Sequence, residues 1–278
     1  MGRKASKQVD FSIVVPVKDE VDLIPTTLPS YYAVNPSEVI ICTDKPTPRK
    51  VRRVVQKVAV ACDALDITRI VEVERDPEYR YHQAWVRRTG FRKAKYDRIL
   101  TVDADLVINK KVLKAVELVG KDNIGLVSCS KKYPYKGIQK IWRMITQKIV
   151  NLVYPIRFTG LYAIWRPYWL DSEDKGIKRL RSPKKIMDGS FEEIVFGEDV
   201  YLHNCLIKKH KGVYLRDVGA VCLTADAQDK PYVQFQIGRY FASRNYNIFQ
   251  ILAKSILYLR FHVMLGWLYE KRKIKNAN

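Results

Sequence analysis

Short apolar runs alternate with longer polar segments through the first part of the chain. The runs occupy residues 11–17, 38–43, 70–73 and 98–102, and Ile and Val are frequent in them. Such runs are typical of strands that are covered on both faces of a sheet. The segment before the fourth run, residues 83–91, has helical character and carries cations. Strands alternating with helical segments of about ten to fifteen residues predict a parallel, Rossmann-like α/β sheet built from βαβ units.

Carboxylates follow two of these runs. Asp44 comes directly after the second run, and Asp103 and Asp105 follow the fourth with one small residue between them. In open α/β sheets, ligands bind beyond the carboxyl ends of the strands. Two carboxylates there suit Mg²⁺ or Mn²⁺ held against a diphosphate, because these cations bind through one or two carboxylates plus substrate phosphates. Taken alone, the pair also fits a solvated turn, and Asp44 also fits a turn or a helix N-cap.

The net charge of the chain indicates anionic binding partners but does not identify which class. The 278 residues include 50 Lys and Arg against 29 Asp and Glu, which gives a formal net charge of +21. Such a surface attracts nucleic acid, anionic lipid or phosphorylated substrates, or it serves solubility alone. Nucleic acid is disfavoured, since the sequence has no zinc-ligand spacing, RNA-recognition signature or helix-turn-helix pattern.

An apolar segment near the C-terminus points to a membrane surface. Residues 247–269 are about long enough to span a bilayer, but Lys254, Arg260 and His262 interrupt them, and charge at bilayer depth is costly. We therefore expect one interfacial amphipathic helix rather than a spanning one, with a narrow polar stripe of Gln250, Lys254, Tyr258 and His262. The alternative is that this helix packs on the rest of the domain or on a second copy of the chain.

The compartment expected for the chain is the cytoplasm, at the inner face of the membrane. A basic cluster follows the apolar segment and suits an anionic cytoplasmic leaflet: Lys271, Arg272, Lys273 and Lys275. No secretory signal is visible in the polar first residues. The five cysteines are scattered and form no C-x-x-C, which favours reduced core thiols: Cys42, Cys62, Cys129, Cys205 and Cys222.

Five motifs, in order, resemble those of family 2 of the glycosyltransferases. The first run continues into Pro16-Val17-Lys18-Asp19-Glu20, which is similar to the family's P-x-x-N-E, and the fourth run ends in the D-x-D pair. Three further motifs read TGLYAIWR at 159–166, GEDVYL at 197–202 and QIGRY at 236–240. The ordered set is much more specific than any of its members. Three positions depart from the family pattern: Asp19 stands where Asn is usual, Lys45-Pro46 follow Asp44 where small residues are common, and Tyr240 replaces Trp.

The resemblance implies a GT-A fold, which is a Rossmann-like mixed sheet flanked by helices, here with a C-terminal amphipathic helical extension. Residues 1–228 would form the catalytic domain, with a nucleotide-binding half at about 10–130 and an acceptor half at about 131–228. Residues 229–278 would form interface helices with the basic tail. The implied donor is a nucleoside-diphosphate sugar linked to UDP or GDP, and Mg²⁺ or Mn²⁺ is the implied cofactor.

The resemblance also assigns donor and metal residues. Asp103 and Asp105 would hold the metal ion, with Asp105 as the direct ligand. Residues matching donor-binding positions are Pro16, Asp19, Glu20, Asp44, Arg87, Arg88, Asp103, Gln236, Arg239 and Tyr240. From the residues alone, Arg87 and Arg88 also fit solvated cations on a helix. Arg239 would brace the diphosphate, because guanidinium binds such groups in a bidentate way, or else it would bind lipid phosphate at the interface.

An acidic pair, Glu198 and Asp199, is the candidate for activating the acceptor. Asp199 resembles the catalytic base of the family's E-D motif, and Glu198 would orient the acceptor or the helix end. Without the other motifs, acidic residues at a helix start are commonplace for capping reasons. The expected reaction is inverting transfer of a sugar to a hydroxyl or phosphate acceptor, either lipid-linked or a growing glycan. Two alternatives are a sugar-phosphate nucleotidyltransferase, although residues 16–20 are not a Gly-rich basic loop, and a non-catalytic basic protein that binds membranes or polyanions.

Overall fold

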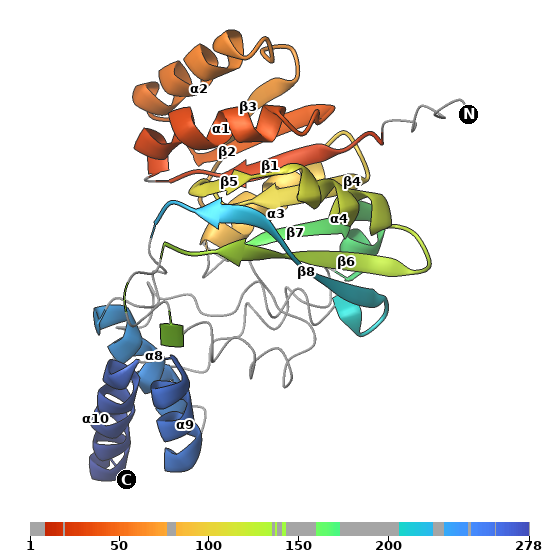
Figure 1. Ribbon diagram of the computed structural model, residues 1–278. Helices are drawn as coiled ribbons and strands as arrows, with labels where there is room; N and C mark the ends of the chain where they lie inside the picture. The colour runs from red at the N-terminus through yellow and green to blue at the C-terminus, as the bar shows by residue number, and fades with distance from the viewer. Residues whose placement is uncertain are drawn as a thin grey trace. The chain divides into compact units, whose positions relative to one another are not determined.

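The chain forms two compact units, which are described separately (Figure 1). The computed structural model describes residues 9–18, 20–76, 82–134, 137, 141–142, 160–172, 206–224, 231–243, 246–258 and 260–277. The described residues of the sheet unit lie within 1–132, 156–182 and 197–223. Those of the helical unit lie within 133–155 and 224–278.

The sheet unit is built on one mixed sheet. Among the described residues its strand order is β3-β2-β1-β4-β7-β6-β8-β5. The first four strands in the sequence run parallel to one another: β1 Ser12–Pro16, β2 Glu38–Asp44, β3 Thr68–Val73 and β4 Arg98–Val102. The others are β5 Leu106–Ile108, β6 Ile124–Lys132, β7 Leu161–Trp165 and β8 Lys211–Cys222. Strand β7 runs antiparallel to β4 and β6, β6 and β8 are parallel, and β5 is antiparallel to β8.

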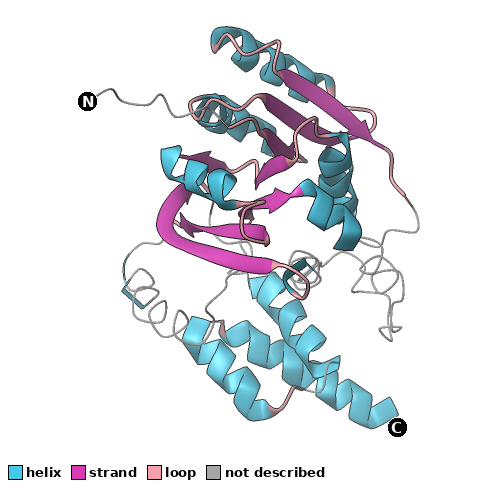
Figure 2. Ribbon diagram, turned by 90° about the vertical axis from the view of Figure 1, so that its right-hand side faces the viewer, coloured by secondary structure: helices cyan, strands magenta, loops and turns pink. Residues whose placement is uncertain are grey.

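Helices lie along both sides of this sheet (Figures 1 and 2). Their bounds are η1 Glu20–Leu23, α1 Ile24–Tyr32, α2 Arg49–Ala61, α3 His82–Lys93, η2 Lys110–Val112 and α4 Leu113–Leu118. Helix α3 approaches the sheet closely at Gly90, where an added Cβ would lie 2.5 Å from Val14 Cγ1 and 2.7 Å from Cys42 Sγ. Only glycine therefore allows α3 to lie this close to β1 and β2.

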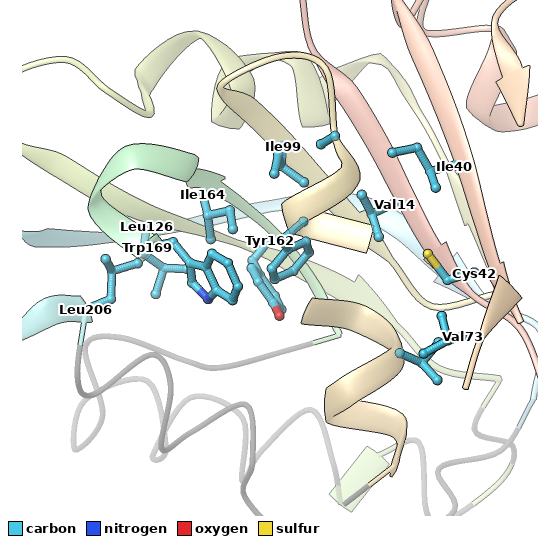
Figure 3. Packing of buried hydrophobic residues seen from close by; sticks show 13 residues of the cluster. Val14, Ile40, Cys42, Val73, Ile99, Leu126, Tyr162, Ile164, Trp169 and Leu206 are labelled. Carbon is cyan, nitrogen blue, oxygen red and sulfur yellow. The ribbon is translucent and has the colours of Figure 1, made fainter. Parts of the chain in front are cut away.

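The core on the α3 face explains why the strand runs are apolar throughout (Figure 3). Val14, Ile40 and Ile99 are fully buried there, together with Trp169, whose ring packs edge-on against Phe91 with centroids 5.1 Å apart. Residues between them along the strands, such as Ile13 and Ile41, are also buried, because side chains alternate between two covered faces. The predicted strands and the helix over 83–91 are confirmed.

The helical unit consists, in its described part, of α8 Pro231–Ser243, α9 Ile248–Tyr258 and α10 Phe261–Ala277. Helices α8 and α10 meet backbone to backbone. A Cβ added at Gly238 would lie 1.9 Å from Val263 O, and one added at Gly266 would lie 1.8 Å from Phe235 O. The two glycines thus permit a helix contact that no larger residue would allow.

The prediction of one helix over 247–269 is wrong. The segment is divided between α9 and α10, and Arg260 lies at the break, where its N–H donates to Ser255 O at 2.8 Å. The break starts α10 in a position where Gly266 reaches Phe235, so tertiary packing overrides the continuous helical pattern. Within the described residues, no helix has both the length and the apolar character needed to cross a bilayer.

Candidate active site

Asp103 and Asp105 lie in a short turn, the acidic turn, between β4 and β5. The main chain of Asp103 is held on both sides: its N–H donates to Gly160 O at 3.2 Å, and its carbonyl accepts from Leu106 N–H at 3.1 Å. The Tyr31 hydroxyl from α1 donates to the same carbonyl at 3.2 Å. The acidic turn is therefore fixed by contacts from distant parts of the sequence.

Two cations contact the Asp103 carboxylate. Arg87 Nη2 donates to Oδ1 at 3.0 Å, and Lys131 Nζ lies 3.7 Å from Oδ2. Their side chains are 5% and 12% exposed, whereas that of Asp103 is 28% exposed. The buried Arg87 and the half-buried Lys131 place positive charge beside a partly exposed carboxylate, and such groups attract an anionic ligand most strongly where water is excluded.

The Asp103 carboxylate also lies directly against a glycine. A Cβ added at Gly160 would lie 1.5 Å from Asp103 Oδ2 and 2.4 Å from its Cγ. Gly160 follows Thr159, which lies outside the described residues, and it immediately precedes β7. The absence of a side chain at position 160 thus creates the space that the carboxylate occupies.

Asp105 is held by the end of β8. Its carbonyl accepts from Leu223 N–H at 2.9 Å, and its Oδ2 accepts from the Cys222 thiol at 3.1 Å. Cys222 is buried, whereas Asp105 is half-buried. The carboxylate of Asp105 therefore has a protein donor on one side while part of it remains open to solvent.

The ends of β1 and β2 lie at the same edge of the sheet as the acidic turn, because β1, β2 and β4 are parallel. Pro16 ends β1 opposite Cys42, and Asp44 ends β2. The Glu20 carboxylate accepts from Lys18 N–H at 2.9 Å, closing the turn after β1. Pro16, Glu20 and Asp44 are thus brought to the edge that carries the acidic turn, as the parallel topology predicts.

A comparison of the sequence with profiles of known protein families gives a match. A sequence profile described as "Glycosyl transferase family 2" matches residues 12–181, which is more than half of the chain and includes the acidic turn. The chain belongs to glycosyltransferase family 2. It is accordingly a glycosyltransferase, and the resemblance drawn from its five motifs is confirmed. The comparison with curated protein sequences gives no match.

Three solved structures that resemble this chain have the same fold. The mannosyltransferase PcManGT from Pyrobaculum calidifontis, in complex with GDP-Man and Mn²⁺, is 17% identical, and the match covers 96% of this chain and 75% of that chain with a TM-score of 0.56. Residues 1–349 of TarS from S. aureus are 15% identical over 97% and 74% of the two chains, with a TM-score of 0.51.

The third is glucosyl-3-phosphoglycerate synthase from Mycobacterium tuberculosis, in complex with Mn²⁺, UDP and phosphoglyceric acid. It is 14% identical over 84% of this chain and 78% of that chain, with a TM-score of 0.50. At these identities the likeness concerns the fold, and the predicted GT-A class is confirmed.

Within this family fold, the two neighbouring arginines of α3 have different surroundings. Arg87 reaches Asp103, whereas Arg88 is fully buried and its guanidinium lies over the Trp169 ring, 5.8 Å from the centroid. Both side chains are buried, which excludes the alternative that they are solvated cations. The structure therefore brings Arg87 but not Arg88 to the acidic turn.

Arg239 lies in the helical unit and is paired there. Its Nε donates to Glu270 Oε2 at 2.7 Å, both side chains are almost fully buried, and the guanidinium lies 5.6 Å from the centroid of the Tyr269 ring. Gln236 and Tyr240 belong to the same helix, α8. Asp19, Glu198 and Asp199 lie outside the described residues, so their assignments stay predictions.

The residues of the acidic turn fit a divalent cation that completes its coordination with a substrate. The described residues contain no group of three or more His, Cys, Asp or Glu side chains that could hold a metal ion by themselves. Mg²⁺ or Mn²⁺ bound together with substrate phosphates is expected to have one or two carboxylate ligands from the protein. The acidic turn supplies two carboxylates, and both residues are half-buried. Asp103 and Asp105 suit this role.

Sequence reasoning missed Lys131, Gly160, Tyr31 and Cys222. Lys131 is one of many lysines in a strongly basic chain, so its type carries no signal. Gly160 belongs to the TGLYAIWR motif, which lies in the predicted acceptor half at about 131–228. Tyr31 and Cys222 contact the acidic turn only through the tertiary structure.

Proposed function

We propose that the chain transfers a sugar from a nucleoside-diphosphate sugar to a hydroxyl or phosphate acceptor, with the donor bound at the acidic turn. The observation that carries the proposal is the placement of Asp103 and Asp105 at the carboxyl edge of the parallel strands of a family 2 sheet, beside Arg87 and Lys131. The solved complexes of proteins with this fold, with GDP-Man and Mn²⁺ and with UDP and Mn²⁺, support the donor class and the metal.

The residues around the donor have distinct proposed tasks. Asp105, with Asp103, would hold Mg²⁺ or Mn²⁺, which offsets the charge that develops on the departing diphosphate. Arg87 holds the Asp103 carboxylate, and Lys131 places a half-buried ammonium beside it. Asp44 at the end of β2 would accept hydrogen bonds from the base or the ribose.

We assign to Asp199 the removal of the proton from the acceptor hydroxyl. A carboxylate is a suitable general base for a hydroxyl that attacks the anomeric carbon, and direct attack inverts the configuration of that carbon. Glu198 would orient the acceptor. Gln236, Arg239 and Tyr240 are proposed as further donor contacts. Arg239 would then exchange Glu270 for the diphosphate, because in this structure the two side chains are paired.

We further propose that the acceptor is lipid-linked or a growing glycan, and that the chain works at the surface of an anionic membrane. The helical unit supports this, because it exposes large apolar side chains around its apolar core of Ile237, Ile251 and Val263, and buries some polar ones. Arg239, Glu270 and Ser255 are at most 5% exposed, whereas Phe249 is 77% exposed. Further exposed apolar side chains of α9 and α10 are Leu252, Ile256, Phe261, Leu265 and Leu268. Such a set of exposed apolar side chains is typical of a surface that contacts other apolar material.

The position of Lys254 agrees with this distribution. Its ammonium lies over the rings of Phe241 and Tyr246, at 5.3 and 5.7 Å from their centroids, and burial lowers its pKa. Of the polar stripe predicted for 247–269, Lys254 is therefore half-buried in the helical unit, whereas Gln250 and His262 are exposed. Exposed apolar residues next to Lys271, Arg272, Lys273 and Lys275 suit an interface with anionic lipid, and the inner leaflet carries such lipid.

Binding of the donor nucleotide tests the first part of the proposal. Isothermal titration of the full chain with UDP and with GDP, with and without Mn²⁺, should show Mn²⁺-dependent binding of at least one nucleotide. Asp105→Ala should remove the metal dependence. Equal binding with and without Mn²⁺ in both proteins would contradict the proposed metal site.

Two experiments test the finer points. Asp199→Asn should abolish transfer but keep Mn²⁺-dependent nucleotide binding, because the base acts on the acceptor; full activity in this variant would refute the assignment.

In flotation assays, the chain should bind vesicles containing phosphatidylglycerol more strongly than vesicles of phosphatidylcholine alone. A variant with Phe249→Ser and Phe261→Ser should float less, with Val60→Ser, an exposed apolar site on α2, as the matched control. Equal flotation of all three proteins would count against the membrane surface.

A further inference from the structure

The end of β8 contacts both the main chain and the side chain of Asp105. In the antiparallel pair of β5 and β8, Leu106 is opposite Cys222, which places Cys222 and Leu223 beside Asp105. Leu223 N–H donates to the Asp105 carbonyl at 2.9 Å, and the Cys222 thiol donates to Oδ2 at 3.1 Å. Two consecutive residues therefore fix the position of the residue and the orientation of its carboxylate.

The backbone of the same segment is fixed from the other side by α1. The Tyr31 hydroxyl donates to the Asp103 carbonyl at 3.2 Å, and the Ser30 hydroxyl accepts from Ile108 N–H at 3.1 Å. Tyr31 is 1% exposed and burial raises its pKa, so that its hydroxyl stays protonated and able to donate. The backbone of the segment is thus held at both ends. The main remaining freedom of Asp105 is rotation of its side chain, which the hydrogen bond from Cys222 restrains.

We propose that Cys222 is a positioning residue for Asp105: its thiol fixes the orientation in which the carboxylate meets a bound divalent cation. The inference rests on the proposed function, in which Asp105 holds the metal ion. Cys222 is 2% exposed, so water does not replace its hydrogen bond, and a bond to a charged acceptor is stronger than one between neutral groups. A thiol carries no positive charge, so unlike Lys or Arg it orients the carboxylate without competing with the cation.

The expected effect follows from what such partners contribute in other metal sites. Groups that hydrogen-bond to a metal-binding carboxylate change the metal affinity by about 10–100-fold when they are removed. Cys222→Ala should therefore raise the dissociation constant for Mn²⁺ by about 10-fold or more. Cys222→Ser keeps a donor of similar size and should restore the constant to within about threefold of the native value, since a hydroxyl also donates to carboxylates.

The test uses Mn²⁺ alone, and free Mn²⁺ is measured by electron paramagnetic resonance in titrations of the whole 278-residue chain. Cys129→Ala is the matched control, because Cys129 is also a buried thiol of this sheet, on β6, and is 1% exposed. Thermal unfolding of every variant shows whether it is folded. If Cys222→Ala is unfolded at the working temperature, the comparison of Cys222→Ser with the native protein at a lower temperature decides.

The outcomes separate this inference from the proposed function. Weak Mn²⁺ binding in Cys222→Ala, with near-native binding in Cys222→Ser and Cys129→Ala, supports the positioning role. Native affinity in Cys222→Ala, or equal weakening in the alanine and serine variants, overturns it. Asp105→Ala is included throughout: if it binds Mn²⁺ like the native protein, the proposed metal site itself is wrong.

Discussion

Replacing Gly160 by alanine adds one methyl group at the point where the structure has no room for it. The new Cβ would lie 1.5 Å from Asp103 Oδ2, 2.4 Å from its Cγ and 2.9 Å from Oδ1, and these are its three nearest atoms. Real Cβ contacts are essentially never shorter than 3.0 Å. The Asp103 carboxylate must therefore rotate away, and the loss should fall on its pairing with Arg87 and Lys131.

The magnitude can be worked from these contacts. Breaking the hydrogen bond with Arg87, a charged and buried group, costs about 1.5–3 kcal/mol. The longer contact with Lys131 adds at most about 1 kcal/mol, as expected for a partly exposed ion pair. A forced rotamer adds about 0.5–1.5 kcal/mol, and new contacts with water return part of the total. We expect Gly160→Ala to lower the free energy of unfolding by about 2–4 kcal/mol.

A double-mutant cycle isolates the cause. In the Asp103→Ala background, the atoms that the new methyl meets are gone, so Gly160→Ala should cost less than about 0.5 kcal/mol there. Backbone strain does not contribute, because the φ of Gly160 lies outside the left-handed region. Urea denaturation of the native protein, both single variants and the double variant gives the coupling energy. Mn²⁺ affinity, measured in parallel, should fall in both single variants.

Two results would refute this reasoning. Native stability in Gly160→Ala would mean that the methyl group and the carboxylate do not meet. An equal loss of stability in both backgrounds, which is a coupling energy near zero, would mean that the chain around Gly160, rather than Asp103, suffers the clash.

Three other predictions concern stability. Gly90→Ala should cost about 1–3 kcal/mol by overpacking, since its methyl would lie 2.5 Å from Val14 Cγ1; an unchanged urea midpoint would contradict the close packing of α3. Glu270→Ala should cost about 3–5 kcal/mol because it removes the buried carboxylate that pairs with the buried Arg239 charge, and Glu270→Gln, compared by the same denaturation, should cost less. Above pH 9 stability should fall, because burial raises the pKa of the Cys129 thiol to about 12, so that the unfolded chain loses a proton that the folded chain keeps. Cys129→Ala should flatten that decline between pH 9 and 12, and an unchanged slope would refute the cause.

The parallel half of the fold could be predicted because its signals are local. Each strand is an uninterrupted apolar run, since β1, β2 and β4 are covered on both faces, and each ends close to a polar residue at one edge of the sheet. The chain order of such strands fixes their direction. The acidic turn was therefore predicted in the right place, with Asp103 and Asp105 after β4.

The partners of that turn could not be predicted, because each comes from a distant segment. Arg87 is predicted as a donor contact, which stays a prediction, and nothing in the sequence indicated that it also pairs with Asp103, 16 residues further along the chain. Cys222 is 117 residues from Asp105 and meets it through the pairing of β8 with β5. Nothing in the local sequence indicates that the twelve-residue strand β8 ends beside Asp105.

The C-terminal helices show a different limit. The apolar pattern over 247–269 correctly indicated helix, but it did not reveal the break at Arg260. The break depends on where α10 contacts α8, which Gly238 and Gly266 decide through backbone contact. Hydrophobic periodicity carries no information about such contacts between small residues.

The most direct test of the central claim is the product released from the donor. Purified protein with Mn²⁺ or Mg²⁺ is given a panel of UDP-, GDP- and dTDP-linked sugars and membrane extract as acceptor source, and nucleoside diphosphate and pyrophosphate are both measured. A metal-dependent glycosyltransferase whose donor lies at the acidic turn should release nucleoside diphosphate from one donor, and lose this activity on chelation and in Asp105→Ala. Release of pyrophosphate, or nucleoside diphosphate release that persists in Asp105→Ala, would contradict the account.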